Sequence, residues 1–197
     1  SRAPPREVAL HVELALRVVA EMRRAGRPAG LVVTGPVDPH RASGRAYLEK
    51  LQVLRGELAL DDWAWFLSEE LPRPPTDAVM NDLYRLADVL FLPSRDEGFG
   101  LPILEAAIHR LPIVCTDLPA LRELAGDSAL YIGPDDDPAE VSGMVLARFA
   151  HSDGGIEAFQ VLAALAREVL QPRCVRLPSR EHGQQPCAEA FDRLGIE

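Results

Sequence analysis

The sequence predicts an α/β fold in which helices cover both faces of a parallel, Rossmann-like sheet. Short apolar segments alternate along the chain with amphipathic segments, a pattern typical of crossover units that join parallel strands. In the segment 88–92 (DVLFL), a continuous apolar run follows Asp88 and ends before Pro93, as expected of a strand buried on both faces. In the first segment, 8–24, apolar residues recur at helical spacing until Gly26 ends the run.

Hydrophobic spacing and turn residues place the other elements in order. Strands are predicted at 31–33, 63–67, 88–92, 113–116 and 129–132. Helices are predicted at 8–24, 46–56, 79–86, 101–110, in a short segment that ends at Leu124, and after Asp137-Pro138. The stretches 37–45 and 71–75 are rich in turn residues and are expected to be loops. Thr76 is expected to cap the helix at 79–86, and Trp63 and Trp65 are interpreted as packing residues.

The length of 197 residues suggests one domain, since domains commonly hold about 100–200 residues. We assign residues 1–170 to this domain. The tail, 171–197, shows little periodicity and is expected to be irregular, with a short helix around 188–194.

Composition excludes several classes of partner. The net charge of −9 and the lack of a polybasic stretch argue against nucleic acid and against docking on anionic lipid. No apolar run approaches the ~20 residues that span a bilayer, and the first residues are unlike a signal peptide. The three cysteines are irregularly spaced and fit neither a zinc site nor a disulfide scaffold. We therefore expect a cytoplasmic protein.

The stretch 94–105 (SRDEGFGLPILE) is the candidate binding segment. It follows the buried strand and opens a helix near Pro102, and Gly98 and Gly100 flank Phe99. Glycine allows unusual backbone angles and a close approach of ligand to the main chain. The N-terminus of a helix presents unpaired N–H groups and a partial positive charge. A diphosphate is the natural ligand of such a segment.

Glu105 strengthens this interpretation. On a helical wheel, Leu101, Leu104 and Ile108 form a stripe that we expect to face inward, and Glu105 lies about 40° from Leu101. A carboxylate close to a buried face must be hydrogen-bonded or paired, and two vicinal ribose hydroxyls are suitable donors. Glu97, at the mouth of the loop, is placed to accept from a second polyol such as a hexose. The alternative is that Glu105 caps a neighbouring loop and Glu97 is a solvated acid.

The run ADVLFLPS at 87–94, followed by EGFGLP at 97–102 and LEA at 104–106, resembles the C-terminal domain of group 1 glycosyltransferases of the GT-B fold. Their signature is a pair of glutamates separated by seven residues, which Glu97 and Glu105 match. Tyr84 stands where that family has a Leu-x-Tyr helix. The resemblance covers about residues 1–150.

The resemblance implies a role for each matching residue. Glu97 would be the catalytic glutamate, holding hydroxyls of the donor hexose and stabilising the reacting sugar. Glu105 would bind the ribose, and the backbone amides at 98–101 (Gly98, Phe99, Gly100 and Leu101) would face the sugar and the diphosphate. Transfer would proceed with retention and without an essential metal or other cofactor, because positive groups and the helix dipole stabilise the leaving diphosphate. The partners implied are a nucleotide sugar and an acceptor-binding N-terminal domain, without which this chain is expected to be inactive.

One feature departs from the family. An Arg and then a Lys usually reach the diphosphate from the start of this domain. Arg2 is the candidate Arg, but Glu7 then stands at the Lys position, and a carboxylate there would repel the diphosphate. Arg6 is an alternative, and a frayed terminal charge is another interpretation of Arg2. The departure leaves open a second function, that of a non-catalytic module that binds nucleotide sugar or serves in assembly.

The remaining candidates are weaker. His40 lies in a loop at the ligand-facing edge and is interpreted mainly as an exposed residue. His109 is expected to cap a helix, and the run 135–137 (DDD) to be solvated caps rather than a metal site. An epimerase or a phosphorylase on the same fold is a third hypothesis. Lys50, the only lysine, lies on an ordinary amphipathic helix, which disfavours the phosphorylase with its cofactor-linked lysine.

Overall fold

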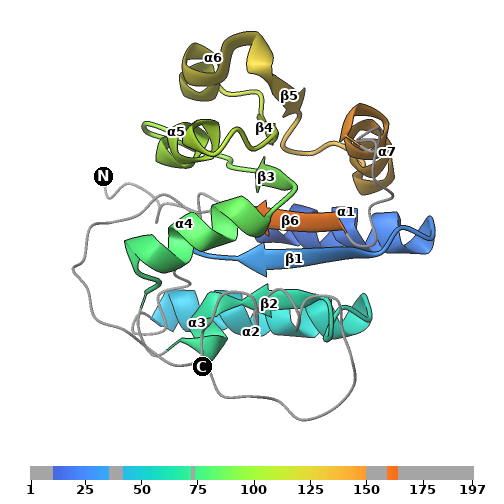
Figure 1. The fold of residues 1–197 in the computed structure, drawn as a ribbon. Coiled ribbons are helices and arrows are strands. Elements are labelled where there is room, and N and C mark those ends of the chain that lie inside the picture. Colours follow the sequence, from blue (N-terminus) through green and yellow to red (C-terminus); the bar gives the residue numbers. More distant parts are fainter. Residues whose placement is uncertain (1–10, 36–41, 72–73, 150–158, 164–197) are drawn as a thin grey trace, which may run out of the picture.

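The computed structural model describes residues 11–35, 42–71, 74–149 and 159–163. Six strands form one sheet, and every pairing between them is parallel. This confirms the predicted Rossmann-like class (Figure 1). The strands are β1 (Ala29–Val33), β2 (Ala64–Phe66), β3 (Val89–Leu92), β4 (Ile113–Thr116), β5 (Ala129–Ile132) and β6 (Phe159–Ala163).

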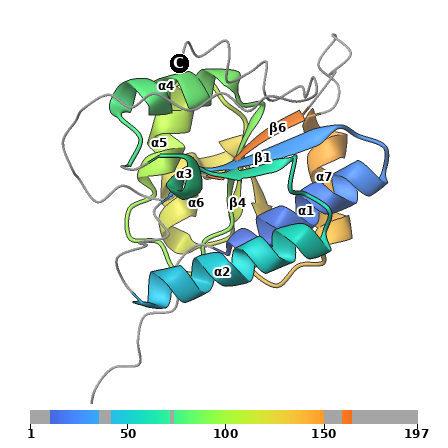
Figure 2. The same ribbon diagram turned by 90° about the horizontal axis from the view of Figure 1, so that it is seen from below.

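Helices cover both sides of this sheet. They are α1 (Val12–Arg24), α2 (Ala42–Glu57), α3 (Leu67–Glu70), α4 (Asp77–Leu86), α5 (Leu101–Ile108), α6 (Pro119–Ala125), the 3-10 turn η1 (Gly126–Ser128) and α7 (Pro138–Phe149). Helices α1 and α2 lie on one side of the sheet and α4 on the other, as Figure 2 shows. Helix α1 packs against α2 and α7, and α5 packs against α6. In the described part of the chain, no helix combines the length and the apolar character needed to cross a membrane.

The sheet order is β2-β1-β6-β3-β4-β5. The chain winds outward from β1 to β2 on one side of β6, and from β3 through β4 to β5 on the other. The order is that of a doubly wound sheet in which β6, the last strand of the described part of the chain, lies between β1 and β3. The winding direction reverses beside β6, and ligands of such sheets bind beyond the carboxyl ends of the strands at this point. The segments that follow β1 and β3 therefore border the expected crevice.

The centre of the sheet is fully buried. All four residues of β3 and all four of β4 are buried, so the prediction from the apolar run at 88–92 is confirmed. In β2, Ala64 and Phe66 are buried and Trp65 is half-buried, as is Trp63 just before the strand. The guanidinium of Arg23 lies 3.4 Å from the ring centroid of Trp63, so that ring packs beneath a cation as well as against the core.

Three features of the fold differ from the sequence-based expectation. Strand β6 was not predicted, because Gln160 interrupts its short apolar run and its pairing with β1 and β3 joins segments far apart in the chain. The short helix α3 was missed, and α2 begins at Ala42, inside the stretch predicted to be a loop. The predicted tail at 171–197 lies outside the described residues.

Candidate functional site

The loop between β3 and α5 leaves the centre of the sheet at its carboxyl edge. Ser94, two residues after the end of β3, is 1% exposed. Gly100 is the N-cap of α5 and has left-handed backbone angles, with φ of 73° and ψ of 36°. Strand β3 thus delivers the predicted binding segment to the edge where ligands of parallel sheets are bound.

Gly100 is required by both its backbone and its surroundings. A Cβ atom there would lie 2.8 Å from Cδ2 of Leu121 and 3.0 Å from Cδ1 of Leu124, both on α6. Only glycine adopts the left-handed region at little cost while leaving this space free. At Gly98, by contrast, φ is not in the left-handed region and an added Cβ would meet nothing within 4 Å. The expected need for an unusual backbone is therefore met at Gly100 and not at Gly98.

Glu97 closes this loop. Its Oε1 accepts a hydrogen bond from the backbone N–H of Gly100 at 3.2 Å, and its Oε2 accepts one from the hydroxyl of Ser94 at 3.4 Å. The side chain is half-buried. A carboxylate at this point is stabilised by the partial positive charge of the α5 N-terminus. The backbone N–H of Gly100 is one of the groups expected to face a diphosphate, and it donates its hydrogen bond to Glu97.

Glu105 lies one turn into α5 and is held by Tyr84 of α4. The Tyr84 hydroxyl donates to Oε2 of Glu105 at 2.8 Å. Tyr84 is only 2% exposed, and burial, followed by the hydrogen bond to Glu105, raises the pKa of its hydroxyl above the ordinary value. The phenol therefore stays protonated and acts as a donor. Its ring stacks on that of His109, with centroids 5.5 Å apart and planes inclined by 5°.

The predicted inward stripe of α5 is wrong. Leu101, Leu104 and Ile108 are 40%, 38% and 79% exposed, respectively. The buried residues of α5 are Pro102, Ile103 and Ala106. Because the helix is apolar on most sides, hydrophobic periodicity alone did not show which side is buried. Glu105 is half-buried because it lies next to the buried Ala106, and not because of its angular distance from Leu101.

The loop tip and the start of α5 are accessible. Phe99 is 59% exposed, and Gly98 is also exposed. The first turn of α5 contains no acidic residue, so the carboxylate at this N-terminus is that of Glu97, which precedes the helix. Among the described residues, neither Glu97 nor Glu105 takes part in an ion pair. Both carboxylates therefore have acceptor capacity that the described residues do not use.

His11 belongs to the same edge of the sheet and was not singled out in the sequence. Its backbone N–H donates to the carbonyl of Pro93 at 2.8 Å, and Nδ1 lies 3.3 Å from the carbonyl of Pro134. Burial and the nearby Arg95 lower the pKa of His11. Arg95 also pairs with Asp135 at 2.7 Å. These contacts join the start of α1 to the segments after β3 and β5, which only the sheet order could have revealed.

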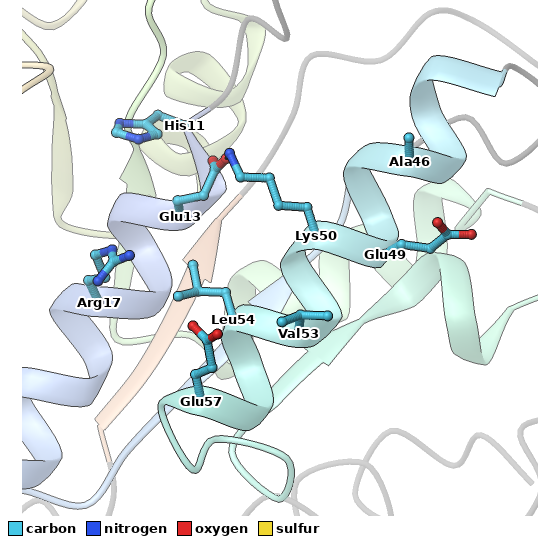
Figure 3. Close-up of a pocket in the computed structure, with 9 residues that line it drawn as sticks. All are labelled: His11, Glu13, Arg17, Ala46, Glu49, Lys50, Val53, Leu54 and Glu57. Atoms are coloured by element: carbon cyan, nitrogen blue, oxygen red, sulfur yellow. The ribbon is translucent and has the colours of Figure 1, made fainter.

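A surface pocket of about 640 Å³ runs from His11 along the groove between α1 and α2. Figure 3 shows Lys50 reaching from α2 toward Glu13 of α1. Glu13 accepts hydrogen bonds from Lys50 at 2.9 Å and from the Tyr47 hydroxyl at 2.7 Å. Although burial opposes it, these bonds lower the pKa of Glu13. The polar groups here tie α1 to α2, and Lys50 is part of that tie. The lining residues are His11, Glu13, Arg17, Ala46, Glu49, Lys50, Val53, Leu54 and Glu57.

The three aspartates after β5 have separate local roles. Asp137 accepts from the backbone N–H groups of Ala139 and Glu140 at 2.8 and 3.3 Å, which makes it the predicted cap of α7. Asp136 accepts from the N–H of Gly133 at 2.6 Å, and Asp135 pairs with Arg95. The described residues contain no group of three or more His, Cys, Asp or Glu side chains suited to a metal ion.

Several predicted residues lie outside the described part of the chain. These are Arg2, Arg6, Glu7 and His40. The structure thus describes Glu97, Glu105 and residues 98–101 of the predicted site, and brings them together around the start of α5.

Comparisons with known proteins show which family the chain resembles along its length. The family model described as "Glycosyl transferases group 1" matches residues 7–148. A D-inositol 3-phosphate glycosyltransferase of Saccharomonospora viridis is 33% identical over 158 residues, which is 79% of this chain and 30% of that protein. The O-antigen chain mannosyltransferase RfbU of Salmonella typhimurium is 36% identical over 91 residues, 46% of this chain and 24% of the relative. A D-inositol 3-phosphate glycosyltransferase of Corynebacterium jeikeium is 37% identical over 106 residues, covering 53% and 23%, respectively.

The matched part of the chain thus spans only 23% to 30% of the length of these relatives. The family match covers well over half of the chain itself and includes every element from α1 to the end of β5. It also includes the glutamate pair around the start of α5. The chain belongs to the group 1 glycosyl transferases.

Proposed function

We propose that this chain is the donor-binding part of a retaining group 1 glycosyltransferase of the GT-B fold. It binds a nucleotide sugar and helps to transfer the hexosyl group to an acceptor held by a separate N-terminal domain. The observation that carries the proposal is the state of the two glutamates. Each is half-buried beside the start of α5, and among the residues that the structure describes its hydrogen-bond donors are neutral.

The two carboxylates suit hydroxyl-rich ligands. A carboxylate accepts hydrogen bonds at about four positions, and Glu97 and Glu105 use only part of this capacity within the described residues. Glu97 would bind the hexose at the loop mouth, where it also stabilises charge on the reacting sugar. Glu105, one turn further along the helix, would bind the ribose.

The diphosphate would lie at the α5 N-terminus between these two groups. The amides of Gly98, Phe99 and Leu101 supply hydrogen-bond donors there, and the helix dipole supplies positive potential. The Gly100 amide would serve the ligand only if Glu97 released it. Arg2 would add a positive side chain, and no metal would be needed, because these groups stabilise the charge that develops on the leaving diphosphate.

Isothermal titration of UDP, GDP and ADP into the 197-residue chain tests this proposal. We expect at least one of them to bind, and Glu105→Ala to weaken that binding about tenfold or more, since a charge-assisted hydrogen-bond pair to the ribose is lost. Glu140→Ala is the matched control, because Glu140 is an exposed glutamate of α7 to which we assign no part of the site. The proposal fails if none of the three nucleotides binds, or if the two variants bind alike.

A second candidate function is that of a non-catalytic module that binds nucleotide sugar or serves in assembly. Glu7, at the position where the family resemblance leads us to expect Lys, favours it. A turnover assay of the full-length gene product with nucleotide-sugar donors separates the two. Release of nucleoside diphosphate supports the enzyme, and binding without turnover supports the module.

A further inference from the structure

Tyr84 has the features of a residue that positions another side chain. It is almost fully buried, yet its hydroxyl projects from α4 onto the carboxylate of Glu105 on α5 at 2.8 Å. A buried phenol needs a partner for its hydroxyl. A carbonyl of the main chain would satisfy that need, but the partner is a side chain at the edge of the proposed site.

The ring of Tyr84 is fixed from a second direction by His109. The two rings are nearly parallel, with centroids 5.5 Å apart. Glu105 and His109 are four residues apart, and residues at this spacing lie on the same side of a helix. One side of α5 therefore holds Tyr84 at two points, its hydroxyl through Glu105 and its ring through His109.

This arrangement leaves Glu105 with one oxygen engaged and one unengaged. Oε2 accepts from Tyr84, while Oε1 accepts from no described residue. A glutamate has several rotatable bonds, and fixing it before the ligand arrives removes an entropic cost from binding. The unengaged oxygen is then presented in one orientation.

We propose that Tyr84 is a positioning residue that orients Glu105 to recognise the ribose and so makes the site select ribonucleotides over 2′-deoxyribonucleotides. This inference rests on the proposed function, because it assumes that Glu105 meets the ribose of the donor. Vicinal hydroxyls can both reach a carboxylate whose orientation is fixed. A 2′-deoxyribose lacks one of these hydroxyls and leaves part of the carboxylate unpaired.

The test compares two probes on the 197-residue chain and its Tyr84→Phe variant. The probes are whichever of UDP, GDP and ADP binds and its 2′-deoxy analogue. We expect the unaltered chain to prefer the ribonucleotide by about tenfold. Tyr84→Phe keeps the ring and its stacking but removes the hydroxyl. We expect this variant to lose most of the preference because its affinity for the ribonucleotide falls, while its affinity for the 2′-deoxy analogue stays unchanged.

Tyr47→Phe is the matched control. Tyr47 is also a partly buried tyrosine whose hydroxyl donates to a carboxylate, that of Glu13, at 2.7 Å. A purely structural contribution of a tyrosine hydroxyl would lower Tm in both variants and leave the preference between the two probes unchanged. If Tyr84→Phe folds poorly, His109→Ala provides a second variant, which leaves the hydroxyl in place but frees the ring. We expect a smaller loss of the preference in this variant.

The outcomes separate the two claims. If no nucleoside diphosphate binds the unaltered chain, the proposed function fails, and this inference fails with it. If a nucleotide binds and Glu105→Ala weakens it, but the preference for ribose is absent or survives in both Tyr84→Phe and His109→Ala, only the role of Tyr84 is overturned.

Discussion

Replacing Gly100 by alanine should destabilise the fold through two separate effects that the structure allows us to estimate. A non-glycine residue in the left-handed region, here at φ of 73°, costs about 1–2 kcal/mol. The new Cβ would also lie 2.8 Å from Leu121 and 3.0 Å from Leu124. Leu121 is fully buried, so it cannot move without displacing the core, and such overpacking costs about 1–3 kcal/mol. We expect a total near 3 kcal/mol, which corresponds to a fall in Tm of about 6–12 °C.

Two other glycines provide controls for this variant. Gly26 also has a left-handed backbone, with φ of 75°, but an added Cβ would meet nothing within 4 Å. Gly26→Ala should therefore show the backbone cost alone, about 1–2 kcal/mol. Gly98→Ala should change the free energy of unfolding by less than about 0.5 kcal/mol, because neither effect operates there. Urea unfolding followed by circular dichroism measures all three variants. The reasoning is refuted if Gly100→Ala is no less stable than Gly26→Ala.

Three further predictions concern other parts of the fold. Thr76→Ala removes the side-chain oxygen that accepts from the N–H of Val79 at 3.3 Å and should cost about 1 kcal/mol in urea unfolding, whereas Thr76→Ser, which retains the oxygen, should cost much less. The pKa of Glu13 in the folded state lies below its ordinary value near 4.5. The ionised carboxylate therefore adds to the free energy of unfolding above pH 4.5, and this addition is lost as the pH falls through the folded pKa. The stability difference between the unaltered chain and Glu13→Gln should then shrink between pH 6 and pH 3, and a constant difference would contradict the assignment. Burial, with a smaller contribution from Asp117, raises the pKa of Cys115 to about 12. After iodoacetamide treatment at pH 8, mass spectrometry should therefore find the peptide containing Cys115 unalkylated until the protein is unfolded. Rapid labelling of the folded chain would show instead that the thiol is accessible.

The sequence predicted those elements whose stability depends on local pattern. The strands β3, β4 and β5 and the cap of α4 were located correctly, because apolar runs, turn residues and a Thr N-cap are local features. Strand β6 was not found, because Gln160 interrupts its apolar residues and its pairing with β1 and β3 joins segments far apart in the chain.

The candidate site was predictable in its residues but not in its contacts. The spacing of Glu97 and Glu105 and the glycine before the helix were visible in the sequence, and the structure places all three around the start of α5. The wrong side of α5 was predicted to be buried, because a helix that is apolar on most sides has no clear hydrophobic stripe. The contacts of Tyr84 and His11 join segments far apart in the chain, so only the packing of α4 on α5 and the order of the strands could reveal them.

A crystal structure of the chain with the nucleoside diphosphate that binds it tests the proposed donor site most directly. We expect ribose hydroxyls within hydrogen-bond distance of Glu105 and a diphosphate at the N-terminus of α5 beside the 98–101 loop. A nucleotide seated elsewhere, such as in the groove between α1 and α2, with Glu97 and Glu105 making only the contacts to Ser94, Gly100 and Tyr84 described above, would contradict it.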